Sequence, residues 1–281
     1  FKPREYQNLI INQILDKPRT AIWAGMGMGK TSSTLTALET MYLAGESRPT
    51  LVLAPLRVCN STWPEEAHKW AHLTEIDVQP VTGDEKNRLA ALKRDASIYA
   101  CNYQNIPWLV DHYGAHWPFG TVVADESTRL KSFRLRQGGV RAQALAKVAH
   151  KNVKRFINLT GTPAPNGLQD LWGQTWFLDA GQRLGRTYSA FTDRWFCRTA
   201  DGFGRELRSQ SAADEIYNKL RDICLTIEAR DWFDLKEPIV KEIEVEMPRS
   251  ARRLYDQLKK DLILQIEQHT ITAANAAVKT Q

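Results

Sequence analysis

The sequence predicts an α/β fold in which a parallel sheet lies between two layers of helices. Short, uninterrupted apolar runs recur along the chain, and helix-like segments separate them. Runs of this kind are typical of parallel strands that are covered on both faces. Their alternation with helices predicts a doubly wound domain, in which ligands bind at the carboxyl ends of the strands.

The expected elements follow one another in a regular order. Strands are expected at residues 21–24, 50–54, 76–81, 97–101, 121–124 and 155–159, with helices at 32–43, 88–94 and 140–150. Residues 180–236 are rich in aromatic and charged side chains and predict helices and loops rather than sheet. Residues 239–247 alternate apolar and charged side chains, as a half-exposed strand does, and residues 251–268 carry an apolar stripe at helical spacing.

The composition is that of an ordinary soluble globular protein, with 43% apolar and 25% charged residues among 281. No apolar run is long enough to cross a membrane, and the first residues do not form a signal peptide, so no membrane partner is expected. The 4 cysteines show no Cys-x-x-Cys spacing. This pattern predicts neither a zinc site nor a disulfide framework and favours a reducing cytoplasm.

Positive charge is concentrated in one part of the chain. The net charge is +6, and residues 127–169 contain no Asp or Glu but many Lys and Arg residues. A solvated helix face normally mixes both signs, so this segment predicts contact with a polyanion such as nucleic acid. Arg129 and Lys131 are among the candidates.

The segment that begins at Ala24 follows an expected strand and precedes an expected helix, as a phosphate-binding P-loop does. Its glycines let the backbone turn N–H groups toward phosphate oxygens, and the helix adds the positive charge of its N-terminus. Lys30 is expected to reach the β- and γ-phosphates, and the Thr31 hydroxyl to bind Mg²⁺. A flexible glycine-rich turn is the alternative. The predicted nucleotide-binding residues are Gly25, Met26, Gly27, Met28, Gly29, Lys30 and Thr31.

Two acidic residues, Asp125 and Glu126, end an apolar strand downstream of the P-loop. We expect Asp125 to hold Mg²⁺ through water, and Glu126 to orient or deprotonate the attacking water. Such a pair also arises at strand ends by chance, but the P-loop upstream favours the functional interpretation. Lys30 and Glu126 are therefore the predicted catalytic residues.

Two further segments carry weaker signals. Thr160 and Thr162 flank a glycine after the last expected strand, and their hydroxyls suit hydrogen bonds to the loop of Asp125 and Glu126 and to a neighbouring segment. A plain strand-ending turn is the alternative. Near the N-terminus, the Gln7 amide offers a donor and an acceptor together, which matches the edge of adenine.

Together these motifs resemble those of the superfamily-two helicases, specifically the Snf-type ATPases and their phage and bacterial relatives. The segment from Arg4 to Gln7 resembles that family's adenine-reading element, and the P-loop resembles its Met-Gly-Leu-Gly-Lys-Thr. Residues 51–56, with Trp63 and Trp70 beyond, look like its motif Ia, and residues 125–132 resemble Asp-Glu-Ala-His-Arg-Leu-Lys-Asn. Residues 159–172 are very similar to its motif III and the extension of that motif, which is the most specific match.

The resemblance implies a RecA-like lobe that binds ATP and Mg²⁺ at residues 1–180, followed by a helical insertion at residues 181–238. It also implies that the strand and helix of residues 239–281 lead into a second RecA-like lobe, which carries arginine fingers in the family. Too few residues follow Met247 for that second lobe, so we expect it to be missing here and the isolated chain to hydrolyse ATP slowly. Thr128 stands in place of the motif II histidine, which helps couple ATP to the other lobe in relatives.

The resemblance further implies an ATP hydrolase that moves on nucleic acid, with double-stranded DNA as the favoured track. The residues expected to contact DNA or to couple it to ATP are Pro55, Leu56, Arg57, Asn102, Tyr103, Arg129, Lys131, Thr160 and Thr162. Two alternatives stay open. One is the motor subunit of a restriction system, which shares these motifs, and the other is a non-catalytic nucleic-acid-binding module with a vestigial ATP site.

Overall fold

The computed structural model describes residues 2–199, 204–233 and 244–268 of the chain. The chain divides into two compact units, Phe1–Leu235 and Lys236–Gln281. The boundary expected at residue 180 lies inside the first unit, which contains all strands found in the described part of the chain.

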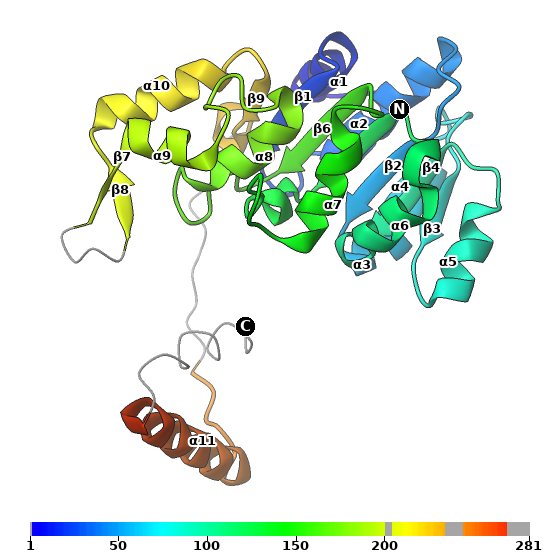
Figure 1. The fold of residues 1–281 in the computed structure, drawn as a ribbon. Helices are drawn as coiled ribbons and strands as arrows, with labels where there is room; N and C mark the ends of the chain where they lie inside the picture. Colours follow the sequence, from blue (N-terminus) through cyan, green and yellow to red (C-terminus); the bar gives the residue numbers. More distant parts are fainter. Residues whose placement is uncertain (1, 200–203, 234–243, 269–281) are drawn as a thin grey trace. The chain divides into compact units, whose positions relative to one another are not determined.

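A seven-stranded parallel sheet forms the centre of the first unit, and its strands follow the order β3-β4-β2-β5-β6-β1-β9 (Figure 1). The six strands predicted from apolar runs are all present, with small shifts at their ends. From β1 the chain passes to β2 and then to β3 at one edge of the sheet, and it returns through β4, β5 and β6 to the side of β1. The strands are β1 (Arg19–Ala24), β2 (Thr50–Ala54), β3 (Val78–Val81), β4 (Ile98–Asn102), β5 (Thr121–Asp125), β6 (Arg155–Thr160) and β9 (Cys224–Ile227).

Helices cover both faces of this sheet, because successive strand residues point to opposite faces and both sets are apolar. In β2, Leu51 and Leu53 belong to one buried cluster, whereas Val52 and Ala54 belong to the other. The first cluster includes residues of α6 (Ile106–Tyr113), α7 (Val140–Ala149) and α8 (Asp170–Asp179), and the second includes residues of α1 (Glu5–Asp16), α2 (Lys30–Leu43) and α4 (Thr62–Lys69). Two short helices, α3 (Leu56–Asn60) and α5 (Glu85–Leu92), both contact the edge strand β3.

Residues 180–236 differ from the expectation of helices and loops without sheet. They contain α9 (Tyr188–Trp195), an antiparallel hairpin of β7 (Phe196–Arg198) and β8 (Arg205–Leu207), α10 (Gln210–Leu220) and β9. Strand β9 pairs in parallel with β1 and becomes the seventh strand of the main sheet. The prediction was wrong for β9 because only five residues, Ile223–Ile227, lie between the charged Asp222 and Glu228, and a run of this length does not stand out.

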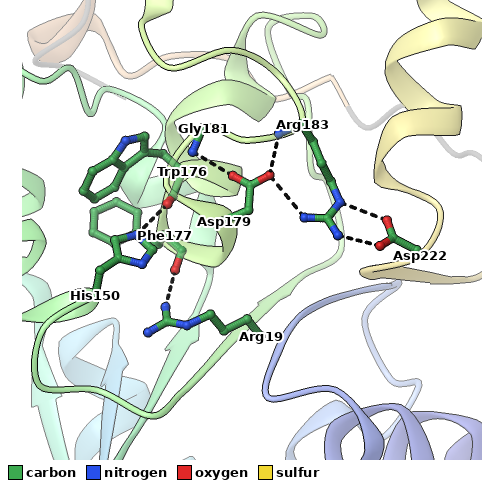
Figure 2. A network of polar contacts seen from close by, with 8 residues as sticks. All are labelled: Arg19, His150, Trp176, Phe177, Asp179, Gly181, Arg183 and Asp222. Carbon is green, nitrogen blue, oxygen red and sulfur yellow. Dashed lines mark hydrogen bonds and ion pairs between the residues drawn. The ribbon is translucent and has the colours of Figure 1, made fainter.

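A polar network at the amino ends of the strands ties this later segment to the sheet (Figure 2). The buried Asp179 carboxylate accepts hydrogen bonds from the backbone N–H groups of Gly181 and Arg183, at 2.8 and 2.9 Å. The Arg183 guanidinium donates in turn to both carboxylate oxygens of Asp222, just before β9. Nearby, the Arg19 guanidinium donates to three backbone carbonyls, one of them that of Phe177 in α8. These contacts anchor the turn that leads into β9.

The second unit contains α11 (Arg249–Gln268), which confirms the helix predicted at residues 251–268. Leu254, Tyr255 and Leu258 on this helix are exposed, at 66%, 52% and 60%. Of the strand predicted at residues 239–247, residues 239–243 lie outside the described residues, and residues 244–247 are not a strand. In the described part of the chain, no helix is both long and apolar enough to span a membrane.

Candidate functional site

The P-loop connects the end of β1 to the start of α2, as the sequence predicts. Gly27 and Gly29 have φ values of +75° and +68°, which L side chains rarely adopt. The Lys30 ammonium donates hydrogen bonds to the carbonyls of Ala24 and Gly25, at 2.6 and 2.9 Å, and so lies across the curled loop. Burial lowers the pKa of Lys30, and the charges of Asp125 and Glu126 act in the opposite direction. The loop therefore presents a partly desolvated cation close to both predicted acids.

Gln7 lies directly against the P-loop. Its carbonyl oxygen accepts a hydrogen bond from the Arg4 backbone N–H at 2.9 Å, which fixes the side chain at the start of α1. A Cβ atom added at Gly29 would be 2.2 Å from the Gln7 amide nitrogen. The absence of a side chain at Gly29 is thus what allows Gln7 to approach the loop.

A cavity of about 650 Å³ opens beside this loop. Its lining combines the start of α1, the P-loop and α4, and it also includes an aromatic residue from beyond β9. The lining residues are Arg4, Tyr6, Gln7, Gly27, Gly29, Lys30, Thr31, Ser32, Thr62, Glu66, Lys69, Trp70 and Phe233. No phosphate-binding motif includes Thr62, Glu66, Lys69 or Phe233, so the sequence pattern does not predict their place in this site. Met26, by contrast, is 96% exposed and does not line the cavity.

The first acid of the pair, Asp125, ends β5 and is held by two aromatic side chains. Its Oδ2 atom accepts a hydrogen bond from the indole Nε1 of Trp63 at 2.9 Å. Its backbone carbonyl accepts a hydrogen bond from the Tyr103 hydroxyl at 2.9 Å. Burial raises the pKa of Asp125, while the Trp63 hydrogen bond and the charge of Lys30 oppose that rise. Both contacts favour a fixed carboxylate.

The second acid, Glu126, has a left-handed backbone with φ +62°, a conformation that is uncommon for residues other than glycine. Its Oε1 atom accepts hydrogen bonds from the hydroxyls of Thr128 at 2.9 Å and Thr160 at 3.1 Å. The Thr160 hydroxyl oxygen also accepts a hydrogen bond from the backbone N–H of Thr162, at 3.2 Å. The Thr160 hydroxyl at the end of β6 thus contacts Glu126, as the sequence predicts. The Thr128 hydroxyl donates to the same carboxylate oxygen.

The predicted nucleic-acid residues divide into exposed and buried sets. Exposed residues follow three neighbouring strands: Leu56 and Arg57 come after β2, Arg129 after β5, and Thr162 after β6. Pro55, the residue that precedes α3, is partly buried. The exposed residues therefore share one edge of the sheet, because carboxyl ends of adjacent parallel strands meet there.

The buried set corrects part of the expectation. Asn102 and Tyr103 are only 7% and 1% exposed, and Thr160 is 1% exposed, so these side chains are not available to phosphates in this structure. Asn102 is hydrogen-bonded to Gln104 and Asn105 instead. Lys131 forms an ion pair with Asp170 at 3.1 Å. The sequence pattern predicts these segments but not the direction of their side chains.

Within the basic segment of residues 127–169, several Lys and Arg side chains bond to other parts of the protein and are not available to a polyanion. The Arg155 guanidinium donates to two backbone carbonyls of α1, and the Arg134 guanidinium donates to those of Lys131 and Phe133. Lys154 lies 4.0 Å from Glu46. The exposed basic residues that remain are Arg129, Arg136, Arg141, Lys147 and Lys151.

The residues at this site fit a nucleotide with its divalent cation. A glycine-rich loop at a helix N-terminus suits phosphate oxygens, and the Lys30 ammonium supplies a matching charge. Hard oxygen donors such as the Thr31 hydroxyl and the Asp125 carboxylate suit Mg²⁺. The cavity beside the loop leaves room for the rest of a nucleotide.

Comparison with known proteins finds one family that matches most of the chain and several relatives of similar sequence. The SNF2-related domain family matches residues 19–280. Protein p41 of Acyrthosiphon pisum secondary endosymbiont phage 1 is 58% identical over 285 residues, which cover 100% of this chain and 62% of that protein. Helicase SWR1 of Yarrowia lipolytica is 26% identical over 255 residues, which cover 84% of this chain and 13% of that protein. The chain thus spans only part of the length of these relatives.

Solved structures give a consistent picture of the fold. The Sulfolobus solfataricus SWI2/SNF2 ATPase core in complex with dsDNA is similar with a TM-score of 0.65 and 21% identity, over 96% of this chain and 54% of that chain. The Sulfolobus solfataricus SWI2/SNF2 ATPase core domain gives a TM-score of 0.61 and 22% identity, over 96% and 53%. At this identity the likeness concerns the fold alone, and it confirms the predicted RecA-like parallel sheet flanked by helices.

Proposed function

This chain belongs to the SNF2-related domain family, and from that membership we propose that it is the ATP-binding lobe of a DNA-dependent ATPase. In this proposal the protein hydrolyses ATP and couples hydrolysis to movement along double-stranded DNA. The observation that carries the proposal is the position of Glu126, fixed by Thr128 and Thr160 close to the P-loop lysine. Two hydroxyls that hold the Glu126 carboxylate in one position favour a catalytic site over a vestigial one.

Each residue has a separate part in the proposed reaction. The Lys30 ammonium leaves the carbonyls of the loop and pairs with the β- and γ-phosphate oxygens, whose charge it neutralises. Thr31 and Asp125 would hold Mg²⁺, which supplies further charge neutralisation on the phosphates when bound. Glu126 orients the attacking water and accepts its proton. Gln7 contacts the base from its place beside Gly29.

DNA is proposed to lie along the exposed edge formed by Leu56, Arg57, Arg129 and Thr162. Contacts there would be made to phosphates and would therefore not depend on sequence. Thr162 is joined to Glu126 through Thr160, at 3.2 and 3.1 Å. Support for a duplex track comes from the structural relative that was solved in complex with dsDNA.

A second RecA-like lobe is part of the proposal, since nucleotide sites of this kind lie between two lobes. The chain covers 62% of its phage relative, which leaves room for such a lobe in that protein. Closure of the two lobes around ATP would complete the site and advance the motor on its track. We propose that this activity takes place in the cytoplasm of a bacterial or phage-infected host cell, where ATP and DNA are both present.

Two measurements test the proposal. Calorimetry on this chain should show Mg²⁺-dependent ATP binding that Lys30→Ala removes. In a protein that also carries the second lobe, DNA should stimulate ATP hydrolysis, and Glu126→Gln should abolish hydrolysis but leave ATP binding unchanged. Retained hydrolysis in Glu126→Gln would refute the role of Glu126, and ATP binding that is indifferent to Lys30→Ala would refute the nucleotide site.

A further inference from the structure

Phe233 brings a distant part of the first unit into the nucleotide cavity. It lies beyond β9, yet its ring lines the same cavity as Gly29 and Lys30. No phosphate-binding or base-reading motif contains this residue, and the sequence around it predicts no contact with the P-loop. Its place in the cavity is a product of the fold, because β9 returns the chain to the side of β1.

Two residues of the N-terminal segment hold the Phe233 ring. The buried Tyr6 ring meets it nearly edge-on, with ring centroids 5.7 Å apart and an angle of 71° between the planes. The guanidinium carbon of Arg4 lies 5.0 Å from the centroid of the Phe233 ring. Arg4 also lines the cavity and is exposed. The cavity wall therefore contains two flat groups in a cation–π arrangement.

We propose that Arg4 and Phe233 together form the platform on which the aromatic base of the nucleotide stacks. This inference rests on the proposed function, which supplies the nucleotide. Aromatic side chains and guanidinium planes both stack on bases, and this stacking depends on the π-face of the base rather than on its exocyclic groups. Phe233 is thus a specificity-determining residue that favours a nucleotide over a bare polyphosphate.

Two separate parts of the cavity recognise the two ends of the nucleotide in this proposal. The phosphate end is held by the P-loop, whose contacts are the same for ATP and for inorganic tripolyphosphate. The base end is held by the platform, which tripolyphosphate cannot reach. A change in the platform should therefore alter ATP affinity selectively, whereas a change in the general stability of the lobe should alter the affinity for both ligands.

The test compares ATP with inorganic tripolyphosphate by calorimetry on the full chain, each with Mg²⁺ present. Phe233→Ala should weaken ATP binding roughly tenfold, the scale expected for loss of a base stack, and should leave tripolyphosphate affinity unchanged. Phe233→Tyr should bind ATP as the unaltered chain does. Trp232→Ala is the matched control, because Trp232 also packs against Tyr6, with centroids 5.6 Å apart, but does not line the cavity.

Four outcomes would overturn the inference. Unchanged ATP affinity in Phe233→Ala would show that the ring is not a platform, and equal loss for both ligands would show that Phe233 acts only through the stability of the lobe. A loss of ATP affinity in Trp232→Ala equal to that in Phe233→Ala would point to Tyr6 packing instead. If Lys30→Ala weakens ATP binding and Phe233→Ala does not, the platform alone is overturned. If the unaltered chain does not bind ATP, the proposed function is overturned as well.

Discussion

The indole Nε1 of Trp63 donates a hydrogen bond to Oδ2 of Asp125 at 2.9 Å. Trp63 is fully buried in the first turn of α4, and Asp125 lies at the carboxyl end of β5. This contact joins a helix on one face of the sheet to the carboxylate proposed to hold Mg²⁺. A phenylalanine at position 63 keeps an aromatic ring in α4 but has no N–H donor. This substitution therefore tests whether Trp63 positions the Asp125 carboxylate.

Trp63→Phe should weaken ATP binding in the presence of Mg²⁺, because the Asp125 carboxylate loses a donor and its orientation. Hydrogen bonds to charged groups contribute roughly 1.5–3 kcal/mol, so a loss of about tenfold or more in affinity is expected. ATP affinity measured in EDTA should not change. A similar loss with and without Mg²⁺ would mean that Trp63 acts on the cavity through packing alone.

Gly29→Ala should be more harmful than Gly27→Ala, although both glycines have positive φ values, +68° and +75°. Each substitution places an L residue in a left-handed conformation at a cost of roughly 1–2 kcal/mol. At Gly29 the added Cβ would also be 2.2 Å from the Gln7 amide nitrogen, whereas at Gly27 nothing lies within 4 Å. Urea unfolding should show the larger loss of stability for Gly29→Ala.

The same pair offers a rescue experiment. Gln7→Ala removes the nearest atom that the new Cβ would meet and leaves Ser32 Oγ at 3.2 Å. The double variant Gln7→Ala/Gly29→Ala should therefore lose less stability than the sum of the two single substitutions. Additive effects of the two substitutions would contradict a direct contact between Gln7 and Gly29.

Thr160→Val and Thr128→Val should each slow ATP hydrolysis while leaving ATP affinity unchanged, in a protein that carries both lobes. Each substitution keeps the shape of the side chain but removes a hydroxyl that donates to Oε1 of Glu126. We expect a decrease of about tenfold for each, on the scale of one hydrogen bond to a charged group. Because both hydroxyls hold the same oxygen, the double variant should differ from the product of the single effects. Independent effects would show that the two threonines do not position Glu126 jointly.

His150 should make stability depend on pH in the weakly acidic range. Burial lowers the pKa of His150, the charge of Arg19 lowers it too, and the Trp176 carbonyl and Asp179 act in the opposite direction (Figure 2). The unfolded chain therefore takes up the proton at a higher pH than the folded chain. The contribution of His150 to stability is full above about pH 6.5 and is lost as the pH falls toward the lower pKa of the folded state.

The measurement is the urea midpoint at pH 7.5 and at pH 5.5 for the unaltered chain and for His150→Gln. Glutamine keeps a donor for the Trp176 carbonyl, which His150 Nε2 meets at 2.9 Å, but it does not titrate. Since the ring is partly exposed, the difference between the two proteins should be small, with the larger loss on acidification in the unaltered chain. Identical pH dependence would show that His150 does not contribute.

The sequence allowed the main sheet to be predicted because β1, β2, β4, β5 and β6 are buried along nearly their whole length and appear as apolar runs, whereas the edge strand β3 is only partly buried at Gln79 and Pro80. Strand β9 was not predicted, since the five residues between Asp222 and Glu228 are too few to show a clear strand pattern. The P-loop, Asp125 and Glu126 could be predicted because local geometry and residue type together define them. Their partners could not, because contacts such as that of Trp63 with Asp125 join segments that only the fold brings together.

For the predicted DNA-contact residues, the sequence predicts the position along the chain but not whether the side chain is exposed. Tyr103 stands after an apolar strand, where exposed binding residues often lie, yet its ring is buried and its hydroxyl meets the Asp125 carbonyl. Arg57 and Thr162, at equivalent places after β2 and β6, are exposed. Position along the chain predicts which edge of the sheet a residue reaches, whereas the direction of its side chain depends on packing with other segments.

The place of β9 beside β1 bears on the order in which the protein assembles. The Thr20 hydroxyl of β1 donates to the carbonyl of Ile223, a partner 203 residues later in the chain. As the chain leaves the ribosome, the strand that carries the P-loop keeps one unpaired edge until nearly the whole first unit has been made. Unpaired edges invite pairing with other chains, and long-range parallel pairing is slow. The strand that leads into the P-loop is thus open to pairing with other chains during most of the synthesis of the first unit.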